Sequence, residues 1–242
     1  MEGALYVALS SQVALERRMT TIADNVANAN TTGFRATEIK FNEVLKSTGI
    51  ADVSFVNKGA DFLSESSGAL RSTGNPLDFA VKGDAWFALD TPMGQILTRD
   101  GRFSITEAGE LVNVDGYPVL DAGGAPIQIN PGGEPPIAGK DGGLIQNGVR
   151  VAAIGLYTAD MSGGYMRTGS LGMIPTIPPE PAVDRADVGV VQGYLEDSNV
   201  NPIAEMSQLI MVSRAFENAS AMMRATEDTF QEAIRTLGAG RS

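Results

Sequence analysis

The chain of 242 residues contains no cysteine and no histidine. Without cysteine there is neither a disulfide framework nor a thiol nucleophile. Without histidine, the commonest general base, proton shuttle and metal ligand is missing. Of the usual catalytic groups mainly the carboxylates remain, so we predict a protein that is not an enzyme and that holds neither a cofactor nor a metal.

Long apolar runs are also missing. No segment approaches the ~20 consecutive apolar residues that a membrane-spanning helix needs, so we expect no membrane insertion. The start of the chain does not resemble a secretory signal, because Glu2 replaces a basic residue and Glu16-Arg17-Arg18 interrupts the apolar region. We therefore expect a chain that either stays inside the cell or is exported without a cleaved signal.

Basic residues are too few for a nucleic-acid-binding surface. The formal net charge is −11, and the acidic excess lies in the middle of the chain while both ends are nearly neutral. Nucleic acid binding requires a basic patch, so we predict no nucleic acid partner. Surfaces of like charge repel, so neutral ends suit assembly and an acidic middle suits solvent. An ordinary acidic soluble protein explains the charge equally well.

The N-terminal segment has a helical repeat. Residues 3–30 contain no proline, and their apolar positions alternate spacings of three and four, which predicts a helix with a heptad stripe. The stripe consists of Leu5, Ala8, Gln12, Leu15, Met19, Ile22 and Val26. We expect the helix to stop in the run from Asn28 to Gly33, where Gly33 supplies a backbone turn with positive φ. Asn25 and Asn28 are either local capping residues or buried polar groups that set helix register between subunits.

The C-terminal segment repeats this pattern. Pro202 suits the first turn of a helix over residues 202–237, and Asn199 or Asn201 is a candidate cap. The stripe consists of Leu209, Val212, Phe216, Ala219, Met223, Thr226, Phe230, Ala233 and Leu237. Further apolar residues lie off this stripe and indicate more than one contact face: Ile203, Met206, Ile210, Met211 and Met222.

The middle of the chain is punctuated by turns. Residues 71–195 hold most of the 28 glycines and nearly all of the 12 prolines, with short apolar or alternating runs between them. Gly74 begins the turn into the first run, and Asn147-Gly148 is a strong hairpin signal. This spacing predicts an antiparallel meander that closes into a barrel or sandwich. Asp78 alternates with apolar neighbours and is expected to face out.

We therefore predict an α+β fold in which an all-β domain, residues 71–196, is inserted between two heptad helices. Residues 1–35 and 197–242 are expected to form one discontinuous, coiled-coil-like assembly domain. Residues 36–70 read as an extended connector, with a short helical turn around Phe41, Val44 and Leu45.

The stripes of both helices contain small or polar residues, which bury little apolar surface. Ala8, Gln12, Ala219, Thr226 and Ala233 occupy stripe positions, and each buried CH₂ that is lost forfeits about 0.8 kcal/mol. A lone helix pair is therefore marginal, and we hypothesise that the ends complete their packing against other subunits; an intramolecular coiled coil is the alternative. The predicted assembly interface comprises Leu5, Leu15, Met19, Ile22, Val26, Asn25, Asn28, Leu209, Val212, Phe216, Ala219, Met223, Phe230 and Leu237.

Three blocks resemble one known family. Residues 25–35, with the run Asn-Val-Ala-Asn-Ala-Asn-Thr-Thr-Gly-Phe-Arg, resemble the N-terminal signature of bacterial flagellar rod, hook and hook-associated proteins. Residues 73–87 with 98–103 and 109–112 are similar to the central block of that family. Residues 193–201, followed by Glu205-Met206 and 214–217, resemble its C-terminal signature. The blocks occur in family order and span nearly the whole chain.

The resemblance implies a structural subunit of the flagellar basal-body rod, the drive shaft that transmits torque across the periplasm. It implies self-assembly, other axial proteins as partners, and delivery by the flagellar type III export apparatus without a cleaved signal. The length and residues 6–18 look most like a proximal-rod protein, with a distal-rod protein or another axial paralogue as the close alternative.

Two other classes of function stay open at this stage. A glycan hydrolase uses two carboxylates across a cleft, and the β-rich segment offers Asp78, Asp84, Asp100, Glu107, Glu110 and Asp115. Acidic residues are, however, ordinary in turns, and Asp100-Gly101 and Asp115-Gly116 are turn signals. An adhesin-like binding module that does not polymerise is the second alternative.

Overall fold

A computed structural model describes residues 2–40, 43–47, 52–56, 60–169, 172–183 and 185–239. The chain divides into two compact units. The first, which we call the helical unit, contains Met1–Ala27, Thr37–Phe62 and Asn201–Ser242. The second, the β unit, contains Asn28–Ala36 and Leu63–Val200. An N-terminal helix and a C-terminal helix thus flank a mostly antiparallel β region, as the sequence predicts.

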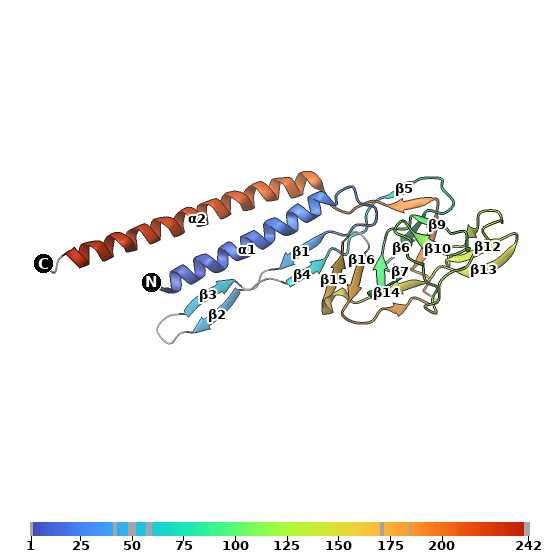
Figure 1. Cartoon of the computed structure of the whole chain (residues 1–242), viewed down its shortest axis with the longest axis horizontal. Coiled ribbons are helices and arrows are strands. Elements are labelled where there is room, and N and C mark those ends of the chain that lie inside the picture. Colours follow the sequence, from blue (N-terminus) through green and yellow to red (C-terminus); the bar gives the residue numbers. More distant parts are fainter. Residues whose placement is uncertain are drawn as a thin grey trace. The chain divides into compact units, whose positions relative to one another are not determined.

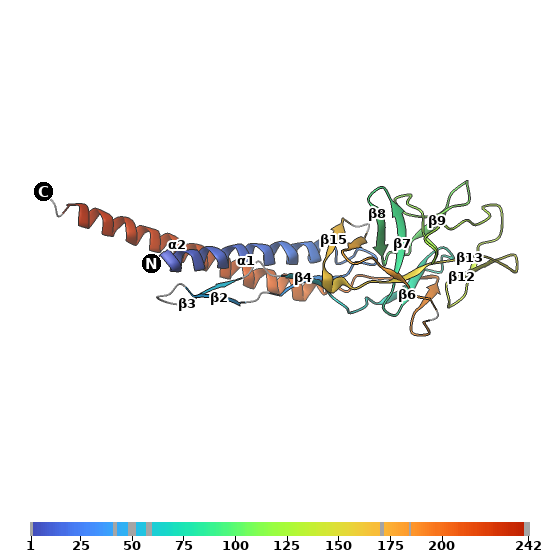
Figure 2. The same ribbon diagram turned by 90° about the horizontal axis from the view of Figure 1, so that it is seen from below.

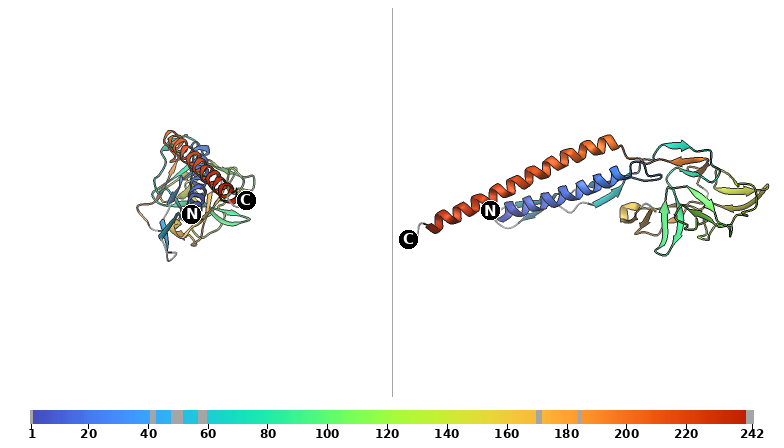
Figure 3. Two further views of the ribbon diagram at one scale, coloured as in Figure 1. Left: turned by 90° about the vertical axis from the view of Figure 1, so that its left-hand side faces the viewer. Right: turned by 45° about the horizontal axis from the view of Figure 1, so that its top comes forward.

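Two antiparallel helices form the frame of the helical unit (Figures 1 and 3). Helix α1 spans Glu2–Ala27, and helix α2 spans Pro202–Ala239 and continues past the beginning of α1. Asn201 caps α2, because its Oδ1 accepts the backbone N–H groups of Ile203 and Ala204, each at 3.2 Å. Neither helix, over its described residues, is both long and apolar enough to cross a bilayer.

Four strands occupy the segment between α1 and the β unit: β1 (Thr37–Lys40), β2 (Glu43–Ser47), β3 (Asp52–Val56) and β4 (Ala60–Leu63). They form two two-stranded sheets, β1-β4 and β2-β3, and both β1 and β3 lie along α1 (Figure 1). The predicted helical turn is wrong, because Val44 and Leu45 pair with Phe55 and Ser54 across the β2-β3 ladder. The strand formers of β3 supply this pairing. Phe41 lies outside the described residues.

The largest sheet of the β unit has six strands in the order β15-β16-β8-β7-β14-β17 (Figures 1 and 2). The pairs for which a register is defined are antiparallel. The strands are β7 (Trp86–Thr91), β8 (Gly94–Thr98), β14 (Leu156–Thr158), β15 (Tyr165–Thr168), β16 (Gly172–Pro175) and β17 (Glu180–Pro181), and the short 3₁₀ helix Met161–Gly163 precedes β15.

Smaller sheets complete the β unit. They pair β5 (Leu70–Ser72) with β19 (Tyr194–Glu196), β6 (Phe79–Lys82) with β18 (Gly189–Gln192), β9 (Phe103–Ile105) with β10 (Leu111–Asn113), and β11 (Ile137–Ala138) with β12 (Gly143–Gln146) and β13 (Val149–Ala153). The β12-β13 hairpin turns at Asn147-Gly148, with φ of 53° and 77°, as the sequence predicts.

The predicted closure into a barrel is not found among the described strands, which are divided over several separate sheets. Proline is one physical reason, because it has no N–H to extend a ladder. Pro118 and Pro126 form only isolated bridges, with Val112 and Leu120. The expected strand at Ile127–Ile129 likewise has no ladder, although both isoleucines are buried.

The core of the β unit lies on both faces of β7, whose side chains alternate in direction. Phe87 joins the larger cluster with Phe79 and Phe103, and the ring centroids of Phe87 and Phe103 are 5.1 Å apart. Trp86 joins the second cluster with Leu97, among others. Phe79, Trp86, Phe87 and Phe103 are therefore core residues.

Asp78 departs from the expectation that it faces solvent. Its residue is only 8% exposed, and its Oδ1 accepts a hydrogen bond of 2.9 Å from Nδ2 of Asn75. A backbone bridge to Arg102 also holds it in the fold. The alternation of Asp78 with apolar neighbours gave a wrong prediction here, because the preceding turn folds back over the residue.

Candidate assembly interface

The predicted stripe of α2 faces inward. Val212 is only 5% exposed, and the other stripe residues from Leu209 to Met223 are half-buried, whereas Thr226 is exposed. Ser220 lies on this side of the helix, and its hydroxyl accepts a 2.7 Å hydrogen bond from Nε2 of Gln12 on α1. The half-buried members are Leu209, Phe216, Ala219 and Met223. The stripe thus packs α2 against α1 within the chain.

The stripe of α1 behaves in the same way. Ile22 is buried, with 4% of its surface exposed, and Leu15, Met19 and Val26 are half-buried. The side chains of Leu5, Phe230 and Leu237 lie outside the described residues.

Each helix also carries exposed large apolar side chains that lie off its stripe, and we call these residues together the outer face. On α2, Ile203 and Ile210 lie half a helical turn away from Val212. The exposed members are Leu9 (48%) and Val13 (48%) on α1, and Ile203 (78%), Met206 (55%), Ile210 (55%), Met211 (62%) and Met222 (71%) on α2. Clustered, exposed large apolar side chains mark interaction sites in soluble proteins.

Asn25 is a buried polar group, but its partners lie in the same chain. It is 2% exposed; its Nδ2 donates to the carbonyl of Thr37 at 2.9 Å, and its Oδ1 accepts the Thr37 N–H at 3.0 Å. This reciprocal pair fixes β1 to α1. Asn28 is half-buried, and its Oδ1 accepts a 3.1 Å hydrogen bond from the hydroxyl of Thr31.

A buried charge network in the β unit has Glu196 at its centre. One carboxylate oxygen forms an ion pair of 3.0 Å with Arg35 and accepts a 3.0 Å hydrogen bond from the backbone N–H of Gly68. The other accepts a 3.1 Å hydrogen bond from Arg99. The side chains of Arg35, Arg99 and Glu196 are exposed by only 3%, 1% and 1%. The segments next to the two helices are thereby tied to the centre of the β unit.

The arginines of the network also contact one aromatic ring. The guanidinium carbons of Arg99 and Arg35 lie 4.9 and 5.7 Å from the centroid of the Trp86 ring, within cation–π range. The pKa of Arg99 is lowered to about 10, mainly by burial; the Glu196 carboxylate opposes this change, and the adjacent Arg35 charge contributes to it. Arg99 therefore stays cationic at neutral pH.

The two predicted backbone turns differ in what requires glycine. Gly33 has a φ of 69°, and a β carbon there would also overlap the backbone of Arg99 and Asp100. Gly74 has a φ of 70°, and its side-chain position is open. Gly68 has an ordinary φ, but a β carbon would overlap the carbonyl oxygen of Asp197. Glycine thus permits three close crossings or turns around the network.

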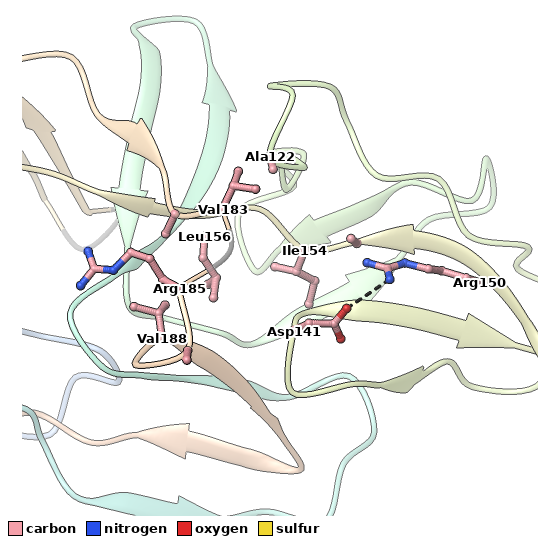
Figure 4. A pocket seen from close by; sticks show the side chains of 11 residues that line it. Ala122, Asp141, Arg150, Ile154, Leu156, Val183, Arg185 and Val188 are labelled. Carbon is pink, nitrogen blue, oxygen red and sulfur yellow. Dashed lines mark ion pairs between the residues drawn. The ribbon is translucent and has the colours of Figure 1, made fainter.

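The β unit has a groove with a volume of about 480 Å³ (Figure 4). Its floor is apolar, with Ile154, Leu156 and Val188, and an Asp141–Arg150 ion pair of 3.1 Å stands at one end. Asp141 is the one carboxylate among the described residues that line it. The pair of carboxylates that glycan hydrolysis needs is therefore not assembled by these residues.

The acidic residues considered for catalysis have local partners instead. The carboxylate of Asp100 pairs with Arg102 at 2.6 Å, and Glu110 accepts a hydrogen bond from Gln128 at 3.2 Å. Asp115 lies in a turn beside Asn113. Within the described part of the chain, no group of three or more acidic residues is arranged to hold a metal ion.

Comparison with known proteins decides between the remaining classes. Over its full length, the chain is 60% identical to the flagellar basal-body rod protein FlgF of Rhizobium meliloti, and the alignment covers all of both chains. The chain belongs to the flagellar basal-body rod protein family. Rod proteins of this family are structural, so the chain is a structural protein of the basal body and not an enzyme.

Further matches agree with this membership. FlgF of Mesorhizobium japonicum is 58% identical over 98% of this chain and 99% of its own length. The distal alternative is more distant: FlgG of Bacillus subtilis is 29% identical over 97% of this chain and 98% of its own. The prediction that the chain is most like a FlgF-type rod protein is confirmed.

Family models match the three blocks that the sequence singles out. The model for flagella basal body rod proteins matches residues 5–35, and the model for the D1 domain of the flagellar hook protein FlgE/F/G matches residues 80–151. The model for the C-terminal region of flagellar basal body rod FlgEFG proteins matches residues 191–236. Most of α1 and most of α2 lie within matched segments.

The network around Glu196 was not predicted from the sequence. Two of its three charged residues directly follow a buried apolar residue, because Glu196 follows Leu195 and Arg35 follows Phe34. A charge placed inside an apolar run is a signal for a buried ion pair, since charged residues are almost never fully buried unless paired.

Proposed function

We propose that this chain is a subunit of the proximal rod and polymerises through the outer face of its terminal helices, with copies of itself and with other axial proteins as neighbours. The observation that carries the proposal is the row of large apolar side chains on α2 that the chain leaves uncovered, from Ile203 to Met222. Family membership supplies the context, because rod proteins are parts of one assembled structure.

The energetics favour contacts with neighbours. Fully burying an exposed Ile or Met side chain contributes about 1.5–3 kcal/mol. The fixed cost of association is about 4–15 kcal/mol, so several such residues must be covered together. Ile203, Met206 and Ile210 follow one side of α2 and offer a continuous strip. Methionine adapts to irregular surfaces, which suits contacts with neighbours that are not all identical.

The interface residues selected from the sequence have an indirect part in this proposal. Leu15, Ile22, Val212 and Phe216 face the partner helix of the same chain, so we propose that they set the geometry in which the outer face is presented. Asn25 stabilises this arrangement through its two hydrogen bonds to the backbone of Thr37. The coiled-coil-like domain thus provides both an internal seam and an external surface.

Torque transmission, location and delivery follow the same proposal. We propose that the well-packed β unit acts as the stiff part of each subunit, and that assembly takes place in the periplasmic part of the basal body. Export by the flagellar type III apparatus without a cleaved signal is the proposed route.

The test is a charge on the outer face. We expect Ile210→Asp to leave the free subunit folded, with an unchanged far-UV circular dichroism spectrum, but to exclude it from isolated basal bodies and to stop swimming. Ile177→Asp is the matched control, because Ile177 is also exposed (45%) but belongs to the β unit. Cells that swim normally with the Ile210→Asp protein in their basal bodies would disprove polymerisation through the outer face.

A second variant separates the two surfaces. Phe216→Asp and Met223→Asp place a charge in the internal seam, where hydration of the charge opposes packing. We expect these variants to lose incorporation together with helical signal in the free subunit. Asp115→Ala, in a turn of the β unit, should preserve both.

A further inference from the structure

One of the two candidate caps in the sequence, Asn199, has another role in the structure, since Asn201 caps α2. Asn199 lies half-buried in the β unit and uses both ends of its side-chain amide. Its Oδ1 accepts the N–H of Ala36 and its Nδ2 donates to the carbonyl of Ser66, each at 2.7 Å. Its own backbone N–H donates to the carbonyl of Phe34 at 3.3 Å. One residue therefore joins three segments that are far apart in the sequence.

These three segments lie where the chain passes between the two units. The chain enters or leaves the β unit after residues 27, 36, 62 and 200. Ala36 is the last residue before one of these passages, Ser66 closely follows the next, and Asn199 lies just before the final one. We call the three segments together the junction: residues 34–36, 64–66 and 199–200. The junction belongs entirely to the β unit, and Asn199 joins the ends of three of the four connections.

The junction also has contacts in which the side chain of Asn199 takes no part. The N–H of Ser64 donates to the carbonyl of Ala36 at 2.9 Å. Phe34, Ala36 and Val200 form a small buried cluster, with exposures of 6%, 8% and 8%. This cluster is separate from the two larger clusters of the β unit, so hydrogen bonds have a larger share in holding the junction. The first segment therefore contacts both of the others directly.

The partners of Asn199 require an acceptor and a donor on one short side chain. The N–H of Ala36 needs an acceptor and the carbonyl of Ser66 needs a donor, and a primary amide offers both. Aspartate would keep the acceptor, and its carboxylate would be hydrated because Ser66 is exposed, but it has no N–H for the carbonyl. Leucine, which has nearly the same shape, offers neither group. Asn199 is thus distinguished by its hydrogen bonds and not by its size.

We propose that Asn199 is a positioning residue that couples the three segments of the junction, so that they open and close together. This role rests on the proposed rod function, in which each subunit passes torque on. Because coupling is carried by contiguous hydrogen-bond networks, a load that arrives through one connection is shared by the other two. A residue that only stabilised its own contacts would not affect an amide that it does not touch, which makes the role measurable.

The first experiment is native-state hydrogen exchange in the free full-length subunit, which needs no assembly. Amides that open in one cooperative step share one opening free energy. We therefore expect the amides of Ala36 and Ser64 to have the same value in the unaltered protein, although only the Ala36 amide is bonded to Asn199. Clearly different values would overturn the proposal without any variant that has to fold.

Substitutions of Asn199 then test whether its amide couples the segments. Asn199→Leu removes both side-chain hydrogen bonds, and we expect the amides of Ala36 and Ser64 both to exchange about 5- to 150-fold faster, the range that loss of a hydrogen-bond partner gives. Asn199→Asp keeps the acceptor for Ala36, so its effect should be smaller. Asn218→Leu, the same change at an exposed position of α2, is the control and should leave both amides unchanged. Faster exchange at Ala36 alone in Asn199→Leu would show that the segments open independently and would refute the proposal.

The second experiment separates this role from polymerisation. Asn199→Leu leaves the outer face intact, so the variant should be present in isolated basal bodies, whereas Ile210→Asp should be absent from them. We expect Asn199→Leu cells to swim in dilute medium but to lose speed more steeply than unaltered cells as viscosity increases the load. Failure of the outer-face proposal would thus appear with Ile210→Asp, and failure of the junction with Asn199→Leu. Asn199→Leu cells whose speed follows the unaltered curve at every viscosity, with the variant in their basal bodies, would overturn the proposed load sharing.

Discussion

The β unit and the helical unit solve the problem of apolar surface in opposite ways. In the β unit, Phe79, Phe87 and Leu89 have no exposed surface. In the helical unit, Ile203 on α2 is 78% exposed and the main buried positions are few, among them Ile22 and Val212. One region completes its own core, and the other leaves its apolar side chains uncovered. On the function that we propose, neighbouring subunits cover the side chains that the helical unit leaves exposed.

The side chains explain the contrast. Strand β7 is covered on both faces, so each of its successive residues buries surface. The helices have one inner stripe each, and that stripe contains alanine at positions such as Ala8 and Ala219, which contribute little area. Helices gain most of their stability from tertiary packing, so the pair is the weaker region of the free subunit.

Hydrogen exchange gives the largest contrast. In the dilute subunit we expect amides of β7 and β8 to exchange only on global unfolding, and those of α2 after Met223 to exchange at least about a thousandfold faster. The measurement is backbone amide exchange followed by NMR or mass spectrometry. Equal protection along the whole of α2 and β7 would show that the helix pair is as stable as the core.

Removal of the central carboxylate should destabilise the β unit, which is the more stable region. Glu196→Gln leaves Arg35 and Arg99 buried without their counter-charge, and we expect a loss of about 3–5 kcal/mol in the unfolding free energy of the β unit. Denaturant titration followed by Trp86 fluorescence measures it. Glu107→Gln, at an exposed turn position, is the control and should change the value by less than about 0.5 kcal/mol. Similar values for both variants would mean that the network adds no stability.

A smaller change is expected where β1 meets α1. Asn25→Ala deprives both backbone groups of Thr37 of their side-chain partner, which should cost the helical unit about 1–3 kcal/mol. The loss should appear in the far-UV circular dichroism of the helices and not in the Trp86 signal. Asn218→Ala, at an exposed position of α2, should leave both signals unchanged. A shift in the Trp86 transition alone would contradict this assignment.

The smallest expected effect comes from an exposed methionine of the helical unit, which can be compared directly with a buried methionine of the β unit. Met211 is 62% exposed on the outer face and Met173 is 2% exposed in the β unit. We expect Met211→Ala to change the stability of the free subunit by less than about 0.5 kcal/mol, and Met173→Ala to cost about 2–5 kcal/mol. Met211→Ala should nevertheless weaken incorporation into basal bodies. If both substitutions destabilise the free subunit equally, the outer face is packed within the chain.

Local signals explain what could be predicted. Pro202 begins α2 as expected, and Asn147-Gly148 makes its hairpin turn, because each rests on the conformational limits of neighbouring residues. The helical repeats are also local, and they predict which sides of α1 and α2 are apolar. The repeats do not predict that the stripe packs within the chain and that other apolar side chains stay exposed, because this depends on how the helices pack.

Long-range pairing explains what could not be predicted from the sequence. Arg99 and Glu196 are 97 positions apart and meet only because several sheets bring their strands together. No periodicity connects them. The strands between α1 and the β unit were missed for a similar reason, since Val44 and Leu45 fit a short helix as well as a strand until Phe55 supplies the pairing partner.

The crossing at Gly68 has a consequence for inheritance. A change at the first or second base of a glycine codon gives the residue a side chain or ends the chain, and at Gly68 a β carbon would coincide with the carbonyl oxygen of Asp197. The two segments would have to separate, and the N–H that Gly68 donates to Glu196 would move with them. We therefore expect the Gly68 codon to change only by silent substitutions, whereas codons for surface residues are free to vary.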